Sequence, residues 1–151
     1  TSQMMALELR ERFRNLSVVT NSIQNALILA ENPGITIILT GGILNRDEYT
    51  LVNDFSSTLE SIHIDIMFMT VTGIDPAIGC TDQRLSEIRI QNQMHRCASR
   101  TIVLADSSKF GKASLLKICP FDEVDTIVTD SGISPELESR IRETGANLII
   151  T

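Results

Sequence analysis

The chain has 151 residues, of which 42% are apolar and 21% charged, and these values are typical of one soluble globular domain. Its net charge of −6 disfavours broad binding to the phosphate backbone of nucleic acids. Cys80, Cys97 and Cys119 are odd in number and lack zinc-site spacing, so we expect a reduced, cytoplasmic protein with no metal. No apolar run approaches the ~18 residues of a membrane span, and no signal peptide is visible.

Helix and strand patterns alternate in the first third of the chain. The predicted elements are a helix carrying Met5, Leu9 and Phe13, a strand over 16–20, a helix over 23–30 and a strand over 35–39. Asn21 or Ser22 is a good N-cap for the second helix, and Asn32-Pro33-Gly34 breaks it. The β-branched run Ile35–Leu39 is typical of a strand covered on both faces.

The alternation continues to the end of the chain. The next predictions are a helix carrying Leu51, Phe55, Leu59 and Ile62, a strand over 64–71, a turn over 73–76 and a helix over about 82–98. They are followed by strands over 101–105 and 125–129 and by a final strand over 148–151. Between the last two strands we expect a helix that Ser134 caps, Pro135 opens and Gly145 ends. This order predicts one α/β domain with a mostly parallel, doubly wound sheet in three layers.

Small polar residues follow every predicted strand. These strand-end segments are Thr20-Asn21-Ser22, Thr40-Gly41-Gly42, Thr72–Asp75 with Gly79-Cys80-Thr81, Asp106–Gly111 and Thr129–Gly132. Ligands of open α/β sheets bind beyond the carboxyl ends of the strands. The sequence therefore predicts a site there for a compact, hydroxylated and anionic ligand.

Each strand-end feature also has a purely structural interpretation. Thr20-Asn21-Ser22 could bind an anion at a helix N-terminus or simply cap that helix. Gly41-Gly42 could admit a ligand close to the backbone or form a tight turn. Asp75 could accept hydrogen bonds from sugar hydroxyls or stabilise its own turn.

The two remaining candidates are charged. Lys109 could meet a phosphate as a point charge, or be an exposed lysine in a capped loop. Glu87 could act as a base or ligand contact, although surface exposure is its default interpretation. His63 and His95 are isolated, and no nucleophile or nucleotide-binding motif is present, so we expect no catalytic residue and no cofactor.

Taken together, the strand-end motifs resemble the C-terminal domain of the DeoR family of bacterial repressors. The runs Val18–Ser22 and Asp106–Gly111 are the most specific parts, and they occur in the family's order with Gly41-Gly42, Gly73-Ile74-Asp75 and Val128-Thr129-Asp130. The resemblance covers essentially the whole chain.

The resemblance implies a sensor domain of the fold shared with ribose-5-phosphate isomerase and CoA transferases, the ISOCOT type. In that family a winged helix-turn-helix precedes the sensor, and a phosphorylated sugar alters operator binding. The residues that match the family's ligand site are Thr20, Asn21, Asp75, Thr81, Glu87 and Lys109. Thr1 and Ser2 match the end of its D-x-G-T-T phosphate loop, while Asn53 stands where the family usually has Gly.

The resemblance also implies what lies outside residues 1–151. We expect the winged helix-turn-helix, the first strand and most of the phosphate loop to be absent from this chain. The chain alone should then not bind operator DNA, and should bind its effector weakly. A homo-oligomer is expected, because repressors of this kind resemble two-fold assemblies on palindromic sites.

Three functions remain open on this basis. The first is a non-catalytic effector sensor in carbohydrate regulation. The second is a sugar-phosphate isomerase, with Glu87 as base, but the chain has Gly73-Ile74-Asp75-Pro76 and no glycine-rich lysine loop. The third is an interaction domain like the related regulatory subunits of translation factors. The motifs favour the sensor.

Overall fold

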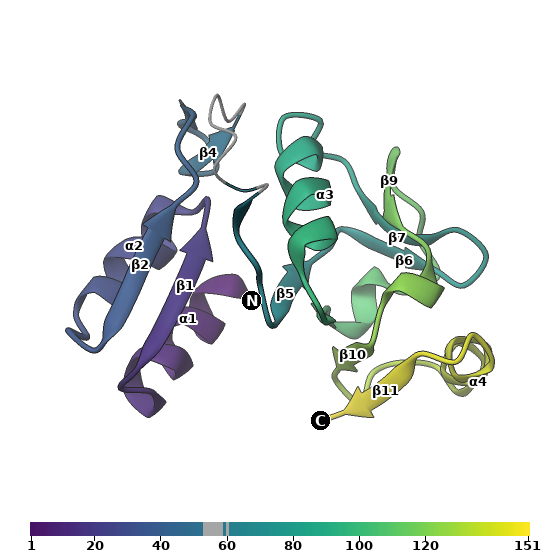
Figure 1. Cartoon of the computed structure of the whole chain (residues 1–151). Coiled ribbons are helices and arrows are strands. Elements are labelled where there is room, and N and C mark those ends of the chain that lie inside the picture. The colour runs from purple at the N-terminus through teal and green to yellow at the C-terminus, as the bar shows by residue number, and fades with distance from the viewer. Residues whose placement is uncertain (53–58, 60) are drawn as a thin grey trace. The chain divides into compact units, whose positions relative to one another are not determined.

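The computed structural model describes residues 1–52, 59 and 61–151 (Figure 1). The chain divides into an N-terminal unit, Thr1–Ser61, and a C-terminal unit, Ile62–Thr151, and each is described by itself. Asn53 and Phe55, which carried two of the expectations above, lie outside the described residues. Within the described ranges, no helix combines the length and the apolar character needed to cross a membrane.

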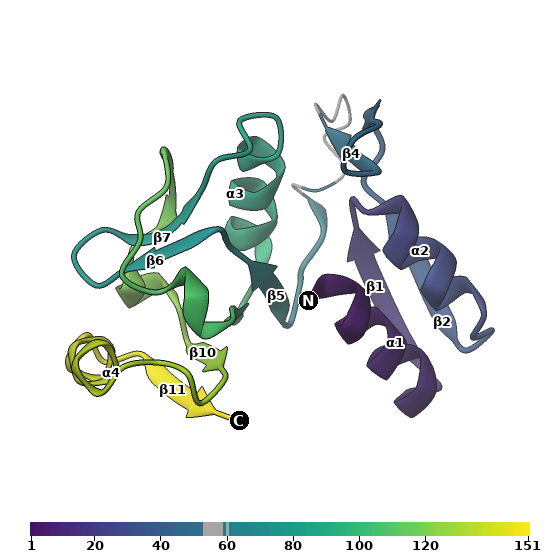
Figure 2. The ribbon, with the colours of Figure 1, turned by 180° about the vertical axis from the view of Figure 1, so that it is seen from behind.

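The N-terminal unit is built on two parallel strands with two helices on one face (Figures 1 and 2). Its elements are α1 (Ser2–Arg12), β1 (Leu16–Thr20), α2 (Ile23–Ala30) and β2 (Ile35–Leu39). Ala6 of α1, Leu29 of α2 and Ile35 of β2 form the core, since alternate strand residues point towards the helices. The four elements predicted for this part of the sequence are confirmed.

A short antiparallel hairpin follows β2. It pairs β3 (Ile43–Asn45) with β4 (Thr50–Val52), and Tyr49 before β4 has a φ of 53°. The prediction of a helix that includes Leu51 is wrong, because Leu51 pairs with Leu44 in this hairpin.

The C-terminal unit contains a four-stranded parallel sheet. Its strands are β5 (Met67–Thr70), β8 (Thr101–Leu104), β10 (Thr126–Thr129) and β11 (Asn147–Ile150), in the order β11-β10-β8-β5. Met69, Val103 and Ile127 are almost fully buried along it. The predicted mixed α/β class with a mostly parallel central sheet is confirmed, and it fits the expected three-layer sensor fold.

Two helices belong to this unit, α3 (Ile88–Cys97) and α4 (Pro135–Glu143). The predicted boundaries of α4 are confirmed. The Ser134 hydroxyl accepts a hydrogen bond from the Leu137 amide at 3.3 Å, and Pro135 occupies the first turn. Gly145 follows the helix with a φ of 86°, a conformation that glycine adopts without steric cost.

The same unit holds an antiparallel sheet that the sequence did not predict. It consists of β6 (Gly73–Asp75), β7 (Gly79–Asp82) and β9 (Leu116–Cys119), in the order β6-β7-β9. Gly73–Asp75 is therefore a strand rather than part of a turn, and the helix expected from about residue 82 begins only at Ile88. Two short 3-10 helices, η2 (Ser107–Lys109) and η3 (Phe121–Glu123), flank β9 in sequence.

Candidate functional site

In the N-terminal unit, the predicted ligand residues gather at one end of the β1–β2 pair. Both helices return antiparallel to β1, so their N-termini lie near the carboxyl ends of the strands, and Gln3 of α1 is hydrogen-bonded to Gln24 of α2. The predicted residues at this end are Thr1, Ser2, Thr20, Asn21, Ser22, Gly41 and Gly42. The seven candidates of this unit thus lie on segments that begin or end at the same end of the strand pair.

Most polar groups at the start of α2 already form hydrogen bonds within the protein. The Ser22 hydroxyl accepts from the Asn25 amide at 3.2 Å, and the Thr20 hydroxyl accepts from the Ser22 amide at 3.1 Å. The Ile23 amide donates to the Tyr49 carbonyl at 2.9 Å. The capping interpretation of Ser22 is therefore confirmed, and few amides of α2 remain for an anion.

Thr40 is a buried residue at the same end of the strand pair. Thr40 follows β2 and is 5% exposed, and its amide donates to the Thr20 carbonyl at 3.2 Å. Its hydroxyl oxygen has no hydrogen-bond partner in the part of the chain that the structure describes. Gly41 and Gly42 follow with φ of 78° and 111°, which supports the tight-turn interpretation. Sequence reasoning located Thr40 at this strand end without assigning it a ligand.

In the C-terminal unit, Asp75 and Thr81 lie on the β6–β7 hairpin. One oxygen of Asp75 accepts from the amides of Ala77 and Ile78 at 2.9 and 3.2 Å, which confirms that Asp75 stabilises its own turn. Thr81 is fully buried, donating to the Gly73 carbonyl at 3.0 Å and accepting from the Ser114 amide at 2.9 Å. Thr81 therefore has a structural role, because both hydrogen bonds of its hydroxyl stay within the protein.

Glu87 is part of a buried charged cluster with Asp82 and Arg84. Glu87 is 3% exposed, so the expectation of surface exposure is wrong. The Arg84 guanidinium lies 2.6 Å from an Asp82 oxygen and 3.1 Å from a Glu87 oxygen. Burial alone would raise the pKa of the Asp82 carboxyl, but hydrogen bonds from Arg84 hold that pKa below its usual value. The D-x-R-x-x-E spacing is the sequence signal for this cluster.

Lys109 lies on the loop that follows β8. Asp106 caps η2 by accepting from the Ser108 amide at 3.0 Å, and hydrogen bonds from Ser108 lower the pKa of Asp106. Asp130 accepts from the Ser107 amide at 2.8 Å, which joins this loop to the end of β10. Half-buried Lys109 forms no ion pair within the described residues.

This loop also reaches the β6–β7 hairpin. The Gly111 amide donates to the Ile74 carbonyl at 2.9 Å, and Ile74 and Phe110 form an isolated bridge. The start of α3 is tied to the parallel sheet, since Gln91 donates to the Thr70 carbonyl at 3.4 Å. Asp75, Thr81 and Lys109 thus lie on segments of the C-terminal unit that hydrogen bonds connect, and Glu87 precedes α3, which is bonded to the parallel sheet.

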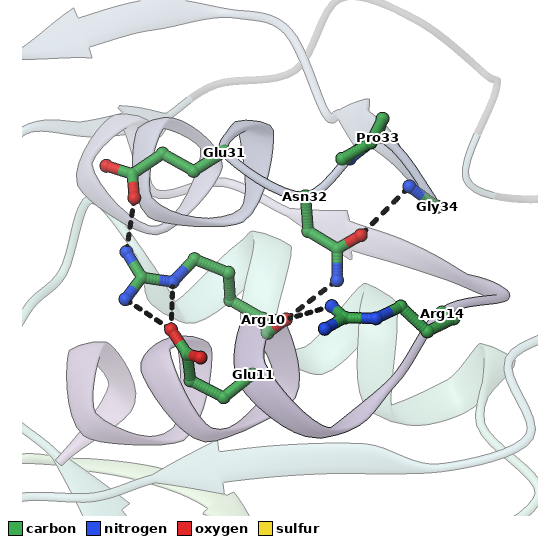
Figure 3. A pocket seen from close by; sticks show the side chains of 7 residues that line it. All are labelled: Arg10, Glu11, Arg14, Glu31, Asn32, Pro33 and Gly34. Carbon is green, nitrogen blue, oxygen red and sulfur yellow. Dashed lines mark hydrogen bonds and ion pairs between the residues drawn. The ribbon is translucent and has the colours of Figure 1, made fainter.

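A pocket of about 450 Å³ lies in the N-terminal unit where α1 ends and β2 begins (Figure 3). Its lining residues are Arg10, Glu11, Arg14, Glu31, Asn32, Pro33 and Gly34. Figure 3 shows these polar groups bonded to one another: Arg10 contacts both glutamates, and Asn32 donates to the Arg10 carbonyl at 2.7 Å. The lining residues therefore connect the end of α1 with the segment between α2 and β2, and the pocket lies away from the predicted strand-end residues.

The two histidines lie apart from these groups. The His95 ring contacts the Thr101 hydroxyl at 2.8 Å and a Glu123 oxygen at 3.1 Å, so it links α3 to its neighbours. His63 contacts the Ser99 hydroxyl at 3.2 Å near the surface. No cluster of three His, Cys, Asp or Glu side chains suited to a metal occurs across residues 1–52, 59 and 61–151.

Known proteins similar to this chain are transcription regulators. The HTH-type transcriptional regulator GolR of Listeria innocua is 31% identical over 96% of this chain and 57% of its own length. The putative aga operon transcriptional repressor of Escherichia coli O157:H7 is 30% identical over 99% and 56%. The L-fucose operon activator of Haemophilus influenzae is 27% identical over 81% and 49%.

The chain spans about half the length of these relatives. Their names are those of regulators rather than enzymes, which confirms the prediction of a regulatory domain without enzymatic activity. A model of the family described as the DeoR C terminal sensor domain matches residues 1–131. The chain therefore belongs to the family of DeoR C-terminal sensor domains.

Proposed function

We propose that this sensor domain binds a phosphorylated sugar or a related metabolite. Lys109 carries the proposal: it is a half-buried residue whose ammonium forms no ion pair in the described chain, on a loop rich in hydrogen-bonding groups. Such a group can meet a phosphate without first breaking a salt bridge. Two relatives are named for the aga operon and the L-fucose operon, which supports a sugar-related ligand.

The internal bonds divide the candidate residues by role. We assign a direct phosphate contact to Lys109 in the C-terminal unit. Within the N-terminal unit, considered by itself, Thr1, Ser2, Asn21, Gly41 and Gly42 are the candidates for ligand contact, and the Asn21 side-chain amide also donates to the Leu51 carbonyl at 3.4 Å. Thr20, Ser22, Asp75, Thr81 and Glu87 position the backbone around those contacts, because their side chains already hold structural hydrogen bonds or ion pairs.

Control of DNA binding by the effector is the second part of the proposal. We propose that effector binding changes operator affinity through a winged helix-turn-helix outside residues 1–151, in a cytoplasmic homo-oligomer. The regulator names of the relatives support this, and so does the acidic charge of −6, which disfavours contact between this chain and DNA.

A thermal-shift screen against sugar phosphates tests the proposal, together with an isomerase assay on every compound that binds. A ligand at about a hundred times its dissociation constant stabilises by about 2.7 kcal/mol, which raises the midpoint by several degrees. Binding without turnover supports a sensor. Turnover of a pentose or hexose phosphate would show an enzyme, and no shift with any sugar phosphate would remove the proposed ligand class.

The Lys109→Ala variant tests the phosphate contact. Loss of a charge-assisted hydrogen bond should weaken a phosphorylated ligand by about 10- to 100-fold and leave its unphosphorylated sugar unchanged. The free energy of unfolding should stay within about 0.5 kcal/mol, since no ion pair is lost. Isothermal titration calorimetry measures both affinities, and Lys112→Ala, an exposed lysine on the same loop, is the matched control. Equal losses for both ligands would remove Lys109 from the phosphate role.

A further inference from the structure

Cys80 of β7 and Cys119 of β9 face each other across the antiparallel sheet. They are direct register partners, are 0% and 1% exposed, and carry free thiols. Directly opposed residues of antiparallel strands share one face, with Cα atoms about 4.5–5.5 Å apart, and a disulfide spans about 4.4–6.8 Å. We propose that Cys80 and Cys119 are a redox site that closes to a reversible disulfide on reaction with a hydroperoxide.

The two thiols are suited to different steps of this reaction. A hydrogen bond from Cys80 lowers the pKa of the Cys119 thiol, while the same contact and burial raise the pKa of Cys80. Cys119 therefore attacks the peroxide as thiolate, forming a sulfenic acid while the leaving alkoxide takes up the thiol proton as an alcohol. The Cys80 sulfur then displaces the hydroxyl of that sulfenic acid, and its proton leaves with the hydroxyl as water.

The oxidant reaches the pair through the edge of the sheet. β9 is an outer strand of the β6-β7-β9 sheet, and its register with β7 shifts between Cys80 and Thr81. An irregular edge strand opens at lower free energy than a central one, so Cys119 becomes exposed more readily than its static burial implies. Gly79 permits the close pairing, because a Cβ there would lie 2.3 Å from the Cys119 carbonyl oxygen.

A Cys97→Ser background isolates the pair. Cys97 lies on α3, half-buried, and its replacement leaves only the two opposed thiols. This variant of the 151-residue chain is treated with one equivalent of hydrogen peroxide, and its thiols are counted after denaturation. Non-reducing peptide mapping locates the bond, and intact mass reports the loss of two hydrogen atoms. The same background with Cys119→Ala or Cys80→Ala is the control.

The expected result is loss of both thiols, a peptide joining Cys80 to Cys119, and full recovery with dithiothreitol. The disulfide closes a loop of roughly 40 residues, so the midpoint of thermal unfolding should rise by about 5 °C or more. Unreacted thiols, oxygen adducts on single cysteines or disulfide-linked dimers would each overturn the proposal. If an alanine variant fails to fold, the peptide map of the Cys97→Ser chain still decides.

Discussion

Thr81 in the C-terminal unit and Thr40 in the N-terminal unit are the same residue type, and both are buried, with exposures of 0% and 5%. The Thr81 hydroxyl donates one hydrogen bond and accepts another, whereas the Thr40 hydroxyl has no partner among the described residues. A buried polar group without a partner destabilises the free protein. The contrast indicates that the Thr81 hydroxyl stabilises the fold, whereas the Thr40 hydroxyl, like that of Thr129, makes no such contribution among the described residues.

The same contrast extends to the charged residues of the C-terminal unit. Asp82 and Glu87 are both paired with Arg84, so their charges are already compensated inside the protein. Lys109 forms no ion pair in the described chain, although its charge contributes to lowering the pKa of Asp106. Residues that follow a strand therefore include some whose polar groups are already paired inside the protein and others whose polar groups are not, and only the second kind fits the proposed ligand contacts.

The largest expected effect comes from Asp82→Ala. Removing this fully buried carboxylate deprives Arg84 of its closest partner and leaves the amides of Gln83 and Arg84 without an acceptor. The free energy of unfolding should fall by about 3 kcal/mol, measured by urea denaturation at neutral pH. A fall below about 1 kcal/mol would show that the cluster contributes little to the fold.

The control for the charge of Asp82 is the pH dependence of stability, compared between the wild type and Asp82→Asn. The pKa of Asp82 is lowered in the folded protein, so its carboxylate stabilises the fold above the unfolded value of about 4. That stabilisation is lost as the pH falls through the lower, folded-state pKa. Wild-type stability should therefore drop on acidification more steeply than that of Asp82→Asn. Parallel pH profiles for the two proteins would contradict this role.

Thr81→Val should have the next largest effect. Valine fills nearly the same volume but leaves the Gly73 carbonyl and the Ser114 amide without their partner. The free energy of unfolding should fall by about 2 kcal/mol in urea denaturation. Thr81→Ser keeps the hydroxyl and should retain most of that stability. Equal losses in both variants would assign the effect to the methyl group instead.

Much of the parallel sheet could be predicted from the sequence, because its strands are short apolar runs with clear turn residues beside them. Strand-end placement of Thr20 and Lys109 followed directly from that pattern. The antiparallel sheet could not be predicted, since β9 is the four-residue run Leu116–Cys119 with polar Lys117 inside it. Without β9, neither the pairing of Cys80 with Cys119 nor the bond from Ser114 to Thr81 is visible in the sequence.

The buried cluster was missed for a different reason. Aspartate, glutamate and arginine are mostly exposed, so a single sequence gives no cause to bury Glu87 unless Arg84 is recognised as its partner. The helix predicted from about residue 82 also placed Asp82 on α3, whereas it ends β7. Such pairings depend on where the chain turns, and local hydrophobic periodicity does not report that.

The smallest expected effect on stability, and the opposite in sign, is that of Thr40→Val. Because the Thr40 hydroxyl has no partner in the described part of the chain, its replacement by a methyl group removes a desolvation cost and breaks no hydrogen bond. The free energy of unfolding should stay unchanged or rise by up to about 1 kcal/mol in urea denaturation. A ligand that bonds to this hydroxyl should lose about 5- to 10-fold in affinity by calorimetry. Thr40→Ser, which keeps the hydroxyl, should bind like the wild type. A loss of stability as large as that of Thr81→Val would mean that both threonines serve the fold, and the distinction between them would fail.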